Sequence, residues 1–421
     1  MVWDTSLLNT GDTAWVLVSC ALVLFMTPGL AFFYGGMVRA KNVLAMLMQN
    51  YFSMGLISVL WAIVGFTLAF GGDSKWIGNF DFFGLKDAST TSVPGLEGLT
   101  IPPLAFLGFQ LMFAIITPAL ITGAIADRMK FSAWAWFLGL WALLVYSPVA
   151  HWVFAPAGWL FKRGALDFAG GTVVHINAGI AALACVIVLG KRRGYPDRPM
   201  PPHNLPWTLL GAGILWFGWF GFNAGSALGA NGIAMQAFLN TNNAAAAAML
   251  GWLLAEKIKT GHATTLGAAS GAVAGLVAIT PCAGFVGGLS PLIIGGIAGV
   301  VCFLAVSLKH KFGYDDSLDV VGVHLVGGII GSLLLGFFAD SSVNSVVTDN
   351  GVFIDDGGTD LLMDQLVAVG ATLVFSFIMT FIIIKVLDLV IPGGVRVSEE
   401  DEEAGLDLTQ HSEVGYALAE R

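Results

Sequence analysis

The stretch DFAGGTVVHINAG, residues 167–179, places an ionisable histidine, His175, in a run of mainly small and aliphatic residues. A second stretch, SLDVVGVHLVGGIIG, residues 317–331, gives His324 nearly the same surroundings. In both stretches a glycine lies four residues after the histidine, and an isoleucine follows that glycine. Because burying an ionisable side chain in apolar surroundings is costly, each histidine indicates a functional site. We expect the two stretches to be paired elements of one pathway.

The composition is that of a helical protein that crosses a membrane several times. Of its 421 residues, 56% are hydrophobic and 11% are charged, whereas about 25% are charged in an ordinary soluble domain. The 54 glycines fit this class, because small residues let membrane helices approach closely. A net charge of -9 argues against nucleic acid as a partner. No disulfide, metal site or cofactor is predicted, because the cysteines lack ligand-like spacing: Cys20, Cys185, Cys282 and Cys302.

Eleven apolar segments are candidates for spanning helices, each of which needs about 20 mostly apolar residues. They cover approximately 13–34, 43–70, 103–126, 131–154, 168–189, 207–225, 233–255, 264–279, 283–308, 318–338 and 361–391. The predicted fold is therefore all-α, a polytopic membrane protein with eleven transmembrane helices.

The basic residues predict the orientation. Alternate short loops, starting with the first, hold twelve Lys or Arg residues, and the opposite loops hold four. Since short cytoplasmic loops carry the excess of Lys and Arg, we expect the N-terminus outside the cell membrane and the C-terminus in the cytoplasm. The acidic loop at 340–360, which contains no Lys or Arg, then lies outside.

The positions of the two histidines predict an inverted repeat. His175 and His324 are 149 residues apart and fall in the fifth and tenth candidate helices. Five helices followed by five that enter from the opposite face place a site at the repeat interface. We expect repeat one at about 13–189 and repeat two at about 207–338, then a final helix at 361–391 and a tail at 392–421. The alternative is a chance similarity in a chain rich in valine and glycine.

Several polar and aromatic side chains are candidates for chemistry. Two imidazoles in contact can relay a small hydrogen-bonding solute or a proton, and the alternative is that each bonds a backbone carbonyl. Asp167 is a natural N-cap for the fifth helix, about 12 Å from His175 along a helix, and its field can still act on a cation at the outer mouth. Phe109 and Phe113 share one helical face, as do Phe222 and Ser226 on another. Rings around a hydroxyl can bind a small cation, although ordinary packing explains such pairs more often.

Long motifs then occur in one order along the chain. They are FYGGMVRAKN (33–42), ITGAIADRMKFSAW (121–134), DFAGGTVVHINAG (167–179), WFGFNAGSA (219–227), NTNNAAAAA (240–248), SGAVAGLVAITPCAGFV (270–286) and DDSLDVVGVH (315–324). Over essentially its whole length the chain resembles the ammonium transporters of the Amt/Mep/Rh family, of the bacterial or archaeal Amt type. The resemblance implies a channel-like transporter of ammonium or methylammonium, not an enzyme, that forms a homotrimer with one pore per subunit.

The resemblance also implies roles for single residues. His175 and His324 correspond to the family's twin pore histidines. Phe113 and Phe222 correspond to the stacked phenylalanines at the outer end of the pore, and Ser226 corresponds to the hydroxyl of the external ammonium site.

Three further residues are candidates for that external site. Asp167 resembles the family's aspartate near it. Phe154 stands where the family commonly has tryptophan, and Trp159 follows five residues later, so either ring can face the cation. Because phenylalanine makes a weaker cation–π contact than tryptophan, the affinity for ammonium is the property that we expect to differ.

The tail differs in composition from the rest of the chain. GGVRVSEEDEEAGLDLTQHSEVGY, residues 393–416, contains a glycine pair and an acidic cluster. The composition predicts a solvated, partly ordered cytoplasmic tail. It resembles the tail through which related transporters communicate between subunits and are blocked by a PII signal protein, so a PII protein is an expected partner.

Three other functions and one mechanistic choice stay open at this stage. The alternatives are a pore for water or another small neutral solute, an ammonium sensor or receptor, and a membrane-embedded hydrolase. His175 has no nucleophile or metal cluster in its helical neighbourhood, which argues against the hydrolase. For a transporter, the proton of ammonium either returns outside or crosses by its own route.

Overall fold

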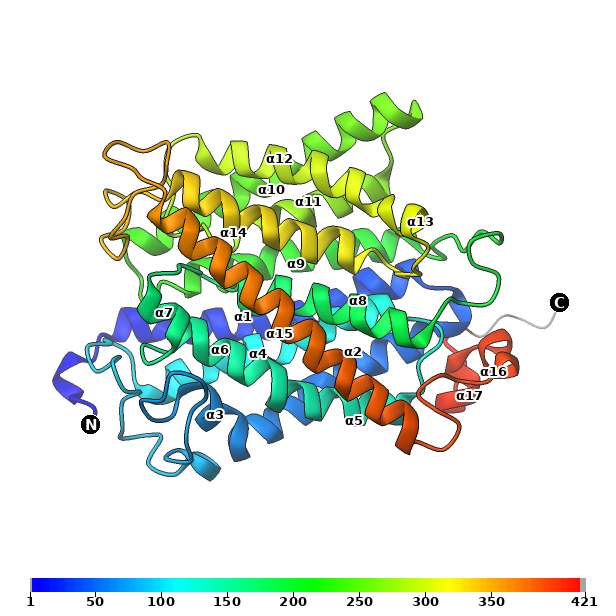
Figure 1. Cartoon of the computed structure of the whole chain (residues 1–421), viewed down its shortest axis with the longest axis horizontal. Helices are drawn as coiled ribbons and strands as arrows, with labels where there is room; N and C mark the ends of the chain where they lie inside the picture. The colour runs from blue at the N-terminus through cyan, green and yellow to red at the C-terminus, as the bar shows by residue number, and fades with distance from the viewer. Residues whose placement is uncertain (1, 417–421) are drawn as a thin grey trace.

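The computed structural model describes residues 2–416, and these form an all-helical membrane fold (Figure 1). Among these residues, nine helices are long and apolar enough to cross a membrane. Two more helices, α10 (Gly232–Thr260) and α11 (Thr265–Ile279), correspond to the remaining two predicted segments and pack against each other and against α9 and α12. The predicted fold class is confirmed.

The part of the chain that corresponds to the predicted repeat one ends with α8. Its helices are α1 (Thr10–Met37), α2 (Val43–Leu60), α3 (Phe66–Phe70), α4 (Pro103–Ile125), α5 (Phe131–Trp141), α6 (Ser147–Phe154), α7 (Trp159–Arg163) and α8 (Asn177–Leu189). The second part contains α9 (Leu205–Gly225), α10, α11, α12 (Ser290–Val306), α13 (Leu308–Phe312) and α14 (Val326–Phe338). The long α15 (Asp360–Val390) and the short α16 (Glu399–Ala404) and α17 (Leu406–His411) follow.

Short π-helical turns interrupt several of these helices. Two of them, η6 (Gly171–Ile176) and η7 (Val321–Leu325), lead into α8 and α14 and contain His175 and His324. The others, η3 (Trp61–Gly65) and η5 (Ala142–Tyr146), join α2 to α3 and α5 to α6. Single π-helical turns occur frequently at functional sites, and here both histidines lie in one.

The ninth predicted helix begins later than expected. A start at 283 is wrong by seven residues, because α12 begins at Ser290. The preceding turn contains Gly288, whose φ of 59° interrupts the helical conformation, and Pro291 stands in the first turn of α12, where proline is well tolerated.

The two histidine-bearing helices cross antiparallel. Arg192, just beyond α8, pairs with Asp315, just before η7, at 2.9 Å, so the end of one helix lies beside the start of the other. At the crossing, a Cβ on Gly179 would lie 2.5 Å from the Leu325 nitrogen, and a Cβ on Gly328 would lie 3.0 Å from Ile176. Each glycine, four residues after one histidine, thus faces the residue directly after the other. This two-fold contact supports the inverted repeat.

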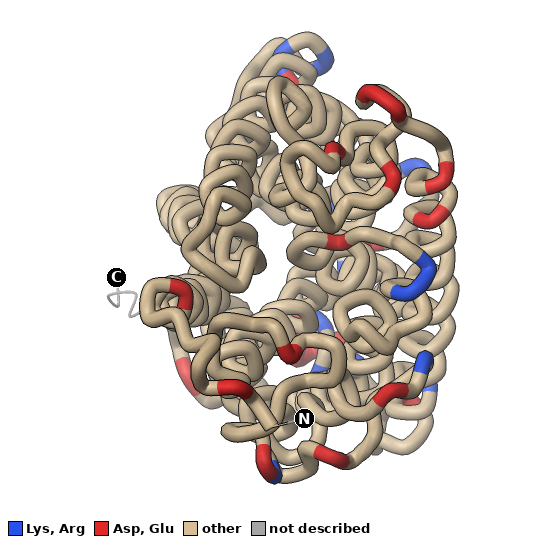
Figure 2. Tube along the Cα trace, turned by 90° about the vertical axis from the view of Figure 1, so that its left-hand side faces the viewer, with Lys and Arg blue, Asp and Glu red and all other residues tan. Residues whose placement is uncertain are grey.

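The helix α15 crosses the bundle diagonally and covers the seam between the two parts (Figure 1). Its Gln365 side chain accepts the Leu166 amide at 2.8 Å and donates to the Ser332 carbonyl at 3.0 Å. One residue thereby joins the segment before η6 to α14. Figure 2 views the end of the bundle that carries the N-terminus, where many loop positions are Asp or Glu.

The tail is docked on the opposite end of the bundle, so it makes more specific contacts than the predicted solvated, partly ordered tail, although most residues of α16 are exposed. Asp407 accepts the Ala45 amide at 2.8 Å, and the Leu406 amide donates to Asn42 at 2.8 Å. Glu402 is 1% exposed and accepts the Arg193 amide and the Arg396 guanidinium, both at 2.7 Å. The acidic cluster is ordered because basic loops lie beside it. The final residues of the predicted tail, 417–421, lie outside the described residues.

Candidate functional site

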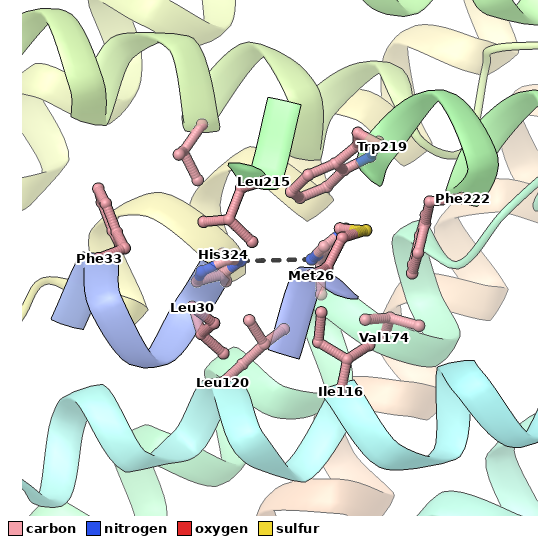
Figure 3. Close-up of a pocket in the computed structure, with 12 residues that line it drawn as sticks. Met26, Leu30, Phe33, Ile116, Leu120, Val174, Leu215, Trp219, Phe222 and His324 are labelled. Carbon is pink, nitrogen blue, oxygen red and sulfur yellow. Dashed lines mark hydrogen bonds between the residues drawn. The ribbon is translucent and has the colours of Figure 1, made fainter. Parts of the chain in front are cut away.

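The two histidines meet in the middle of the bundle. The Nδ1 atoms of His175 and His324 are 3.3 Å apart, and their rings are inclined by only 18° with centroids 5.4 Å apart. The side chains are almost completely buried, with 1% and 3% of their surfaces exposed. Figure 3 shows this contact as a dashed line between the two rings. The alternative in which each histidine bonds only a backbone carbonyl is therefore wrong.

A narrow passage contains the histidine pair. Its cavity measures about 10 Å³, which is room for about one water-sized molecule. The walls are almost entirely aliphatic or aromatic (Figure 3). The lining residues are Met26, Leu30, Phe33, Ile116, Leu120, Val174, His175, Leu215, Trp219, Phe222, Val273 and His324. The imidazoles are thus the main hydrogen-bonding groups that a small solute meets there.

The geometry of the pair fixes complementary tautomers. One Nδ1 donates and the other accepts, so in the neutral pair one ring carries its proton on Nε2 and the other has a lone pair there. The buried Nε2 of His175 has no hydrogen-bond partner among residues 2–416. A solute in the passage can therefore form a hydrogen bond with this nitrogen, whichever tautomer His175 adopts.

A tryptophan that the sequence did not single out supports His175. Trp219 lies parallel to the imidazole, with ring centroids 5.4 Å apart and an inclination of 17°. Its indole N–H donates to the Thr280 hydroxyl at 2.9 Å. The available signal was spacing, because Trp219 precedes Phe222 by three residues and so shares its helical face.

Two stacked phenylalanine rings close one end of the passage. The centroids of Phe113 and Phe222 are 4.3 Å apart and the rings are inclined by 27°. Phe222 lines the passage and Phe113 lines a wider vestibule beyond it. The pair, brought together from α4 and α9, separates the two spaces.

The vestibule has a volume of about 320 Å³ and contains most of the residues predicted for an external site. Phe113, Phe154, Asp167 and Ser226 all line it. The Ser226 hydroxyl donates to the Phe222 carbonyl at 2.8 Å, so its lone pairs are left for other donors. Ser226 also follows the last turn of α9, and the carbonyl end of a helix favours a cation.

Asp167 makes the predicted capping contacts. One carboxylate oxygen accepts the amides of Gly170 and Gly171 at 2.7 Å, and the other accepts the Thr172 amide at 2.8 Å. The Thr172 hydroxyl donates to the same carboxylate. The carboxylate therefore orders the start of η6 while it lies at the wall of the vestibule.

The two aromatic candidates for the cation site lie in different places. Phe154 presents its ring edge-on to Phe113, with centroids 6.5 Å apart and an inclination of 87°. Trp159 is not part of the vestibule wall in the described structure, and its ring packs between Trp76 and Trp152, with centroid distances of 5.6 and 5.8 Å. Gln110, one turn before Phe113, also lines the vestibule and was not predicted.

A second pocket of about 320 Å³, called the second vestibule below, lies toward the opposite end of the bundle. It is lined by Ser270, one turn from Val273 of the passage, and by Asp319, which pairs with Lys309 at 2.5 Å. Nearby, Asp316 accepts the Val321 amide at 2.7 Å.

The position of Asp316 mirrors that of Asp167. Asp316 precedes His324 by eight residues, as Asp167 precedes His175. Burial, together with the neighbouring Asp319, raises the pKa of Asp316 to about 6. Asp316 was not predicted as a site residue, although the sequence contains the shared spacing of eight residues.

An all-helical bundle with a narrow apolar passage, a paired histidine centre and a vestibule at each end defines a channel-like membrane transport protein. Residues 14–416 match the Ammonium Transporter Family, and the chain belongs to this family. It is thus an ammonium transporter and not an enzyme.

Known relatives resemble the chain over nearly its whole length. An ammonium transporter of Mycobacterium tuberculosis is 54% identical, covering 97% of this chain and 91% of the relative. One from Bacillus subtilis is 52% identical, covering 97% and 99%. Among solved structures, Candida albicans Mep2 has a TM-score of 0.88 at 35% identity, covering 94% of this chain and 88% of that chain.

Proposed function

We propose that the protein binds ammonium in the outer vestibule, removes a proton there and passes ammonia through the histidine-lined passage. The observation that carries this proposal is the unpartnered Nε2 of His175 in a passage with room for about one water-sized molecule. Ammonia is of that size and can both donate and accept a hydrogen bond.

Recognition takes place at Ser226 and the surrounding rings. The free lone pairs of the hydroxyl accept an N–H of ammonium, and Phe113 and Phe154 contribute cation–π attraction. The carbonyl end of α9 and the carboxylate of Asp167 add a negative potential. Potassium has the same charge but no N–H to donate, so it gains less from the hydroxyl.

Selection against ions takes place beyond the Phe113–Phe222 pair. A charged solute in the apolar passage loses its hydration without an opposite charge to compensate, which is costly. Ammonium can lose its charge by losing a proton, whereas potassium and sodium cannot. The stacked rings move apart for the neutral molecule and otherwise keep water-borne ions out.

Within the passage the histidine pair supplies hydrogen bonds. One Nε2 donates to the nitrogen lone pair of ammonia, and the other accepts one of its N–H groups. Ammonia leaves past Ser270 and Asp319 and takes up a proton in the inner vestibule. The proton released outside either stays there, or crosses separately through the Nδ1–Nδ1 contact.

We also propose an orientation, an assembly and a partner. The N-terminus lies outside the cell and the tail in the cytoplasm, in agreement with the distribution of Lys and Arg among the loops. The protein forms a homotrimer with one passage per subunit, as the family resemblance implies, and a PII protein binds at the docked tail. The inverted repeat, with the tail as a regulatory segment, is the corresponding domain organisation.

Purified protein in proteoliposomes tests the proposed function. We expect saturable ammonium uptake that methylammonium inhibits and that potassium does not. Ammonium-dependent current on a solid-supported membrane indicates separate proton transfer, whereas flux without current indicates release of the proton outside. Absence of both flux and current would contradict the proposal.

A further inference from the structure

Two consecutive hydrogen bonds hold the Trp219 side chain in place. Its indole N–H donates to the Thr280 hydroxyl at 2.9 Å, and that hydroxyl donates to the Leu276 carbonyl at 2.7 Å. Trp219 is 2% exposed and Thr280 is completely buried, so water does not compete for these contacts. Because the hydroxyl hydrogen points at the Leu276 carbonyl, the direction of the oxygen lone pairs is fixed, and one of them accepts the indole N–H.

Thr280 is itself fixed to the helix that carries His175. It follows the last residue of α11, and the next residue, Pro281, accepts the Phe168 amide at 3.1 Å. The Pro281 ring also fills the space beside Gly171, where an added Cβ would lie 2.5 Å from it. The segment that holds the indole is thus packed directly against the start of η6.

The position of the indole determines what the passage presents to a solute. Trp219 lies flat against His175 and contacts the Phe222 ring at a centroid distance of 5.5 Å. The indole therefore lies beside both the closing ring of Phe222 and the imidazole of His175, whose own centroids are 6.2 Å apart. A rotation of the indole would widen the passage and remove the support from one face of His175.

We propose that Thr280 is a positioning residue for transport, whose hydroxyl holds the Trp219 indole against the His175 imidazole and so sets the width and selectivity of the passage. This inference rests on the proposed function of the passage. Thr280 is not among the residues that line it, and it acts through Trp219. Without the hydroxyl, the buried N–H loses its acceptor, and the indole is free to turn toward the passage.

The test compares Thr280→Val with Thr280→Ser in proteoliposomes, with the methylammonium-to-ammonium rate ratio as the readout. We expect Thr280→Val to change this ratio by about fivefold or more, the size expected when a buried donor loses its partner, and Thr280→Ser to stay within about twofold of wild type. In a Trp219→Phe background, which has no indole N–H, Thr280→Val should cause no further change. Equal effects of Thr280→Val in both backgrounds would overturn the proposal.

A matched control separates positioning from general stability. The Trp141 indole donates to the buried Thr380 hydroxyl at the same distance, 2.9 Å, and neither residue lines the passage. Thr380→Val should lower the unfolding temperature as Thr280→Val does, but leave the rate ratio unchanged. A ratio that changes equally in both valine variants contradicts the inference. A wild-type protein without flux would instead contradict the proposed function.

Discussion

Gly179 leaves room for the backbone of Leu325, whose nitrogen lies 2.5 Å from the position of a Cβ on that glycine. The contact is where α8 crosses the helix that carries His324, so the separation of the histidine pair depends on it. Gly328 has the reciprocal position against Ile176.

Gly179→Ala is therefore expected to destabilise the protein by about 1–3 kcal/mol, because the two backbones must move apart. The measurement is thermal unfolding of the purified protein in detergent. Gly213→Ala in α9 is the control, since a Cβ there has no atom of residues 2–416 within 4 Å. An unfolding temperature for Gly179→Ala equal to that of Gly213→Ala would show that the crossing tolerates the methyl group.

His175→Ala and His324→Ala should each alter transport without unfolding the protein. Each removes hydrogen bonds that ammonia makes only in the passage, and we expect about a tenfold change in rate or a loss of potassium exclusion. Ammonium uptake and potassium flux in the same vesicles measure both properties. Wild-type rate and wild-type exclusion in both variants would refute the role of the pair.

Phe154→Trp should lower the half-saturation concentration for ammonium, because tryptophan makes the stronger cation–π contact. Ser226→Ala should raise it about two- to tenfold through the loss of one hydrogen bond. Trp159→Phe is the matched control, since that ring packs between Trp76 and Trp152. If Trp159→Phe changed the half-saturation and Phe154→Trp did not, the cation site would have to be reassigned.

Deletion of 399–421 should lower transport and abolish inhibition by a PII protein, because the docked tail holds the starts of α2 and α5 through Ala45 and Phe131. Glu402→Gln should lower transport and weaken PII inhibition to a smaller extent, since its carboxylate is paired with Arg396. Glu400→Gln, at an exposed position, serves as the control. Unchanged flux and unchanged regulation in the truncated protein would leave the tail without a function in transport.

Asp316 should make stability depend on pH in a defined window. Its folded-state pKa of about 6 lies above the ordinary value of 3.8, so the folded state prefers the protonated carboxyl. The contribution of Asp316 to the free energy of unfolding is fully present below about pH 4 and is lost as the pH rises to about 6. Asp316→Asn should flatten the difference in unfolding temperature between pH 4.5 and pH 7. An undiminished difference in the variant would assign the dependence to other groups.

Much of the central site could be predicted from the sequence, because polar residues are rare in such an apolar chain. The spacing of His175 and His324 within matching glycine-rich stretches was sufficient to pair them. The Nδ1–Nδ1 contact and the unpartnered Nε2 were not predictable, since they depend on how two helices 149 residues apart are rotated.

Other features depend on contacts that a linear pattern does not contain. Phe154 and Trp159 are separated by five residues, and only the path of the chain after α6 places one in the vestibule and the other in a tryptophan cluster. The Trp219–Thr280 contact joins helices that are adjacent only in three dimensions. The acidic tail was predicted to be solvated because its basic partners, Arg193 among them, are distant in sequence.

The single proton shared by the two Nδ1 atoms has a consequence for the direction of transport. Because the two rings come from antiparallel helices, a molecule entering from either vestibule meets the same pair of groups in reverse order. Such a centre favours neither direction by itself, and the gradients across the membrane decide which way nitrogen flows. A cell that must retain ammonia therefore needs its control point elsewhere, and the tail docked at the end of the bundle opposite the N-terminus lies where such control can act.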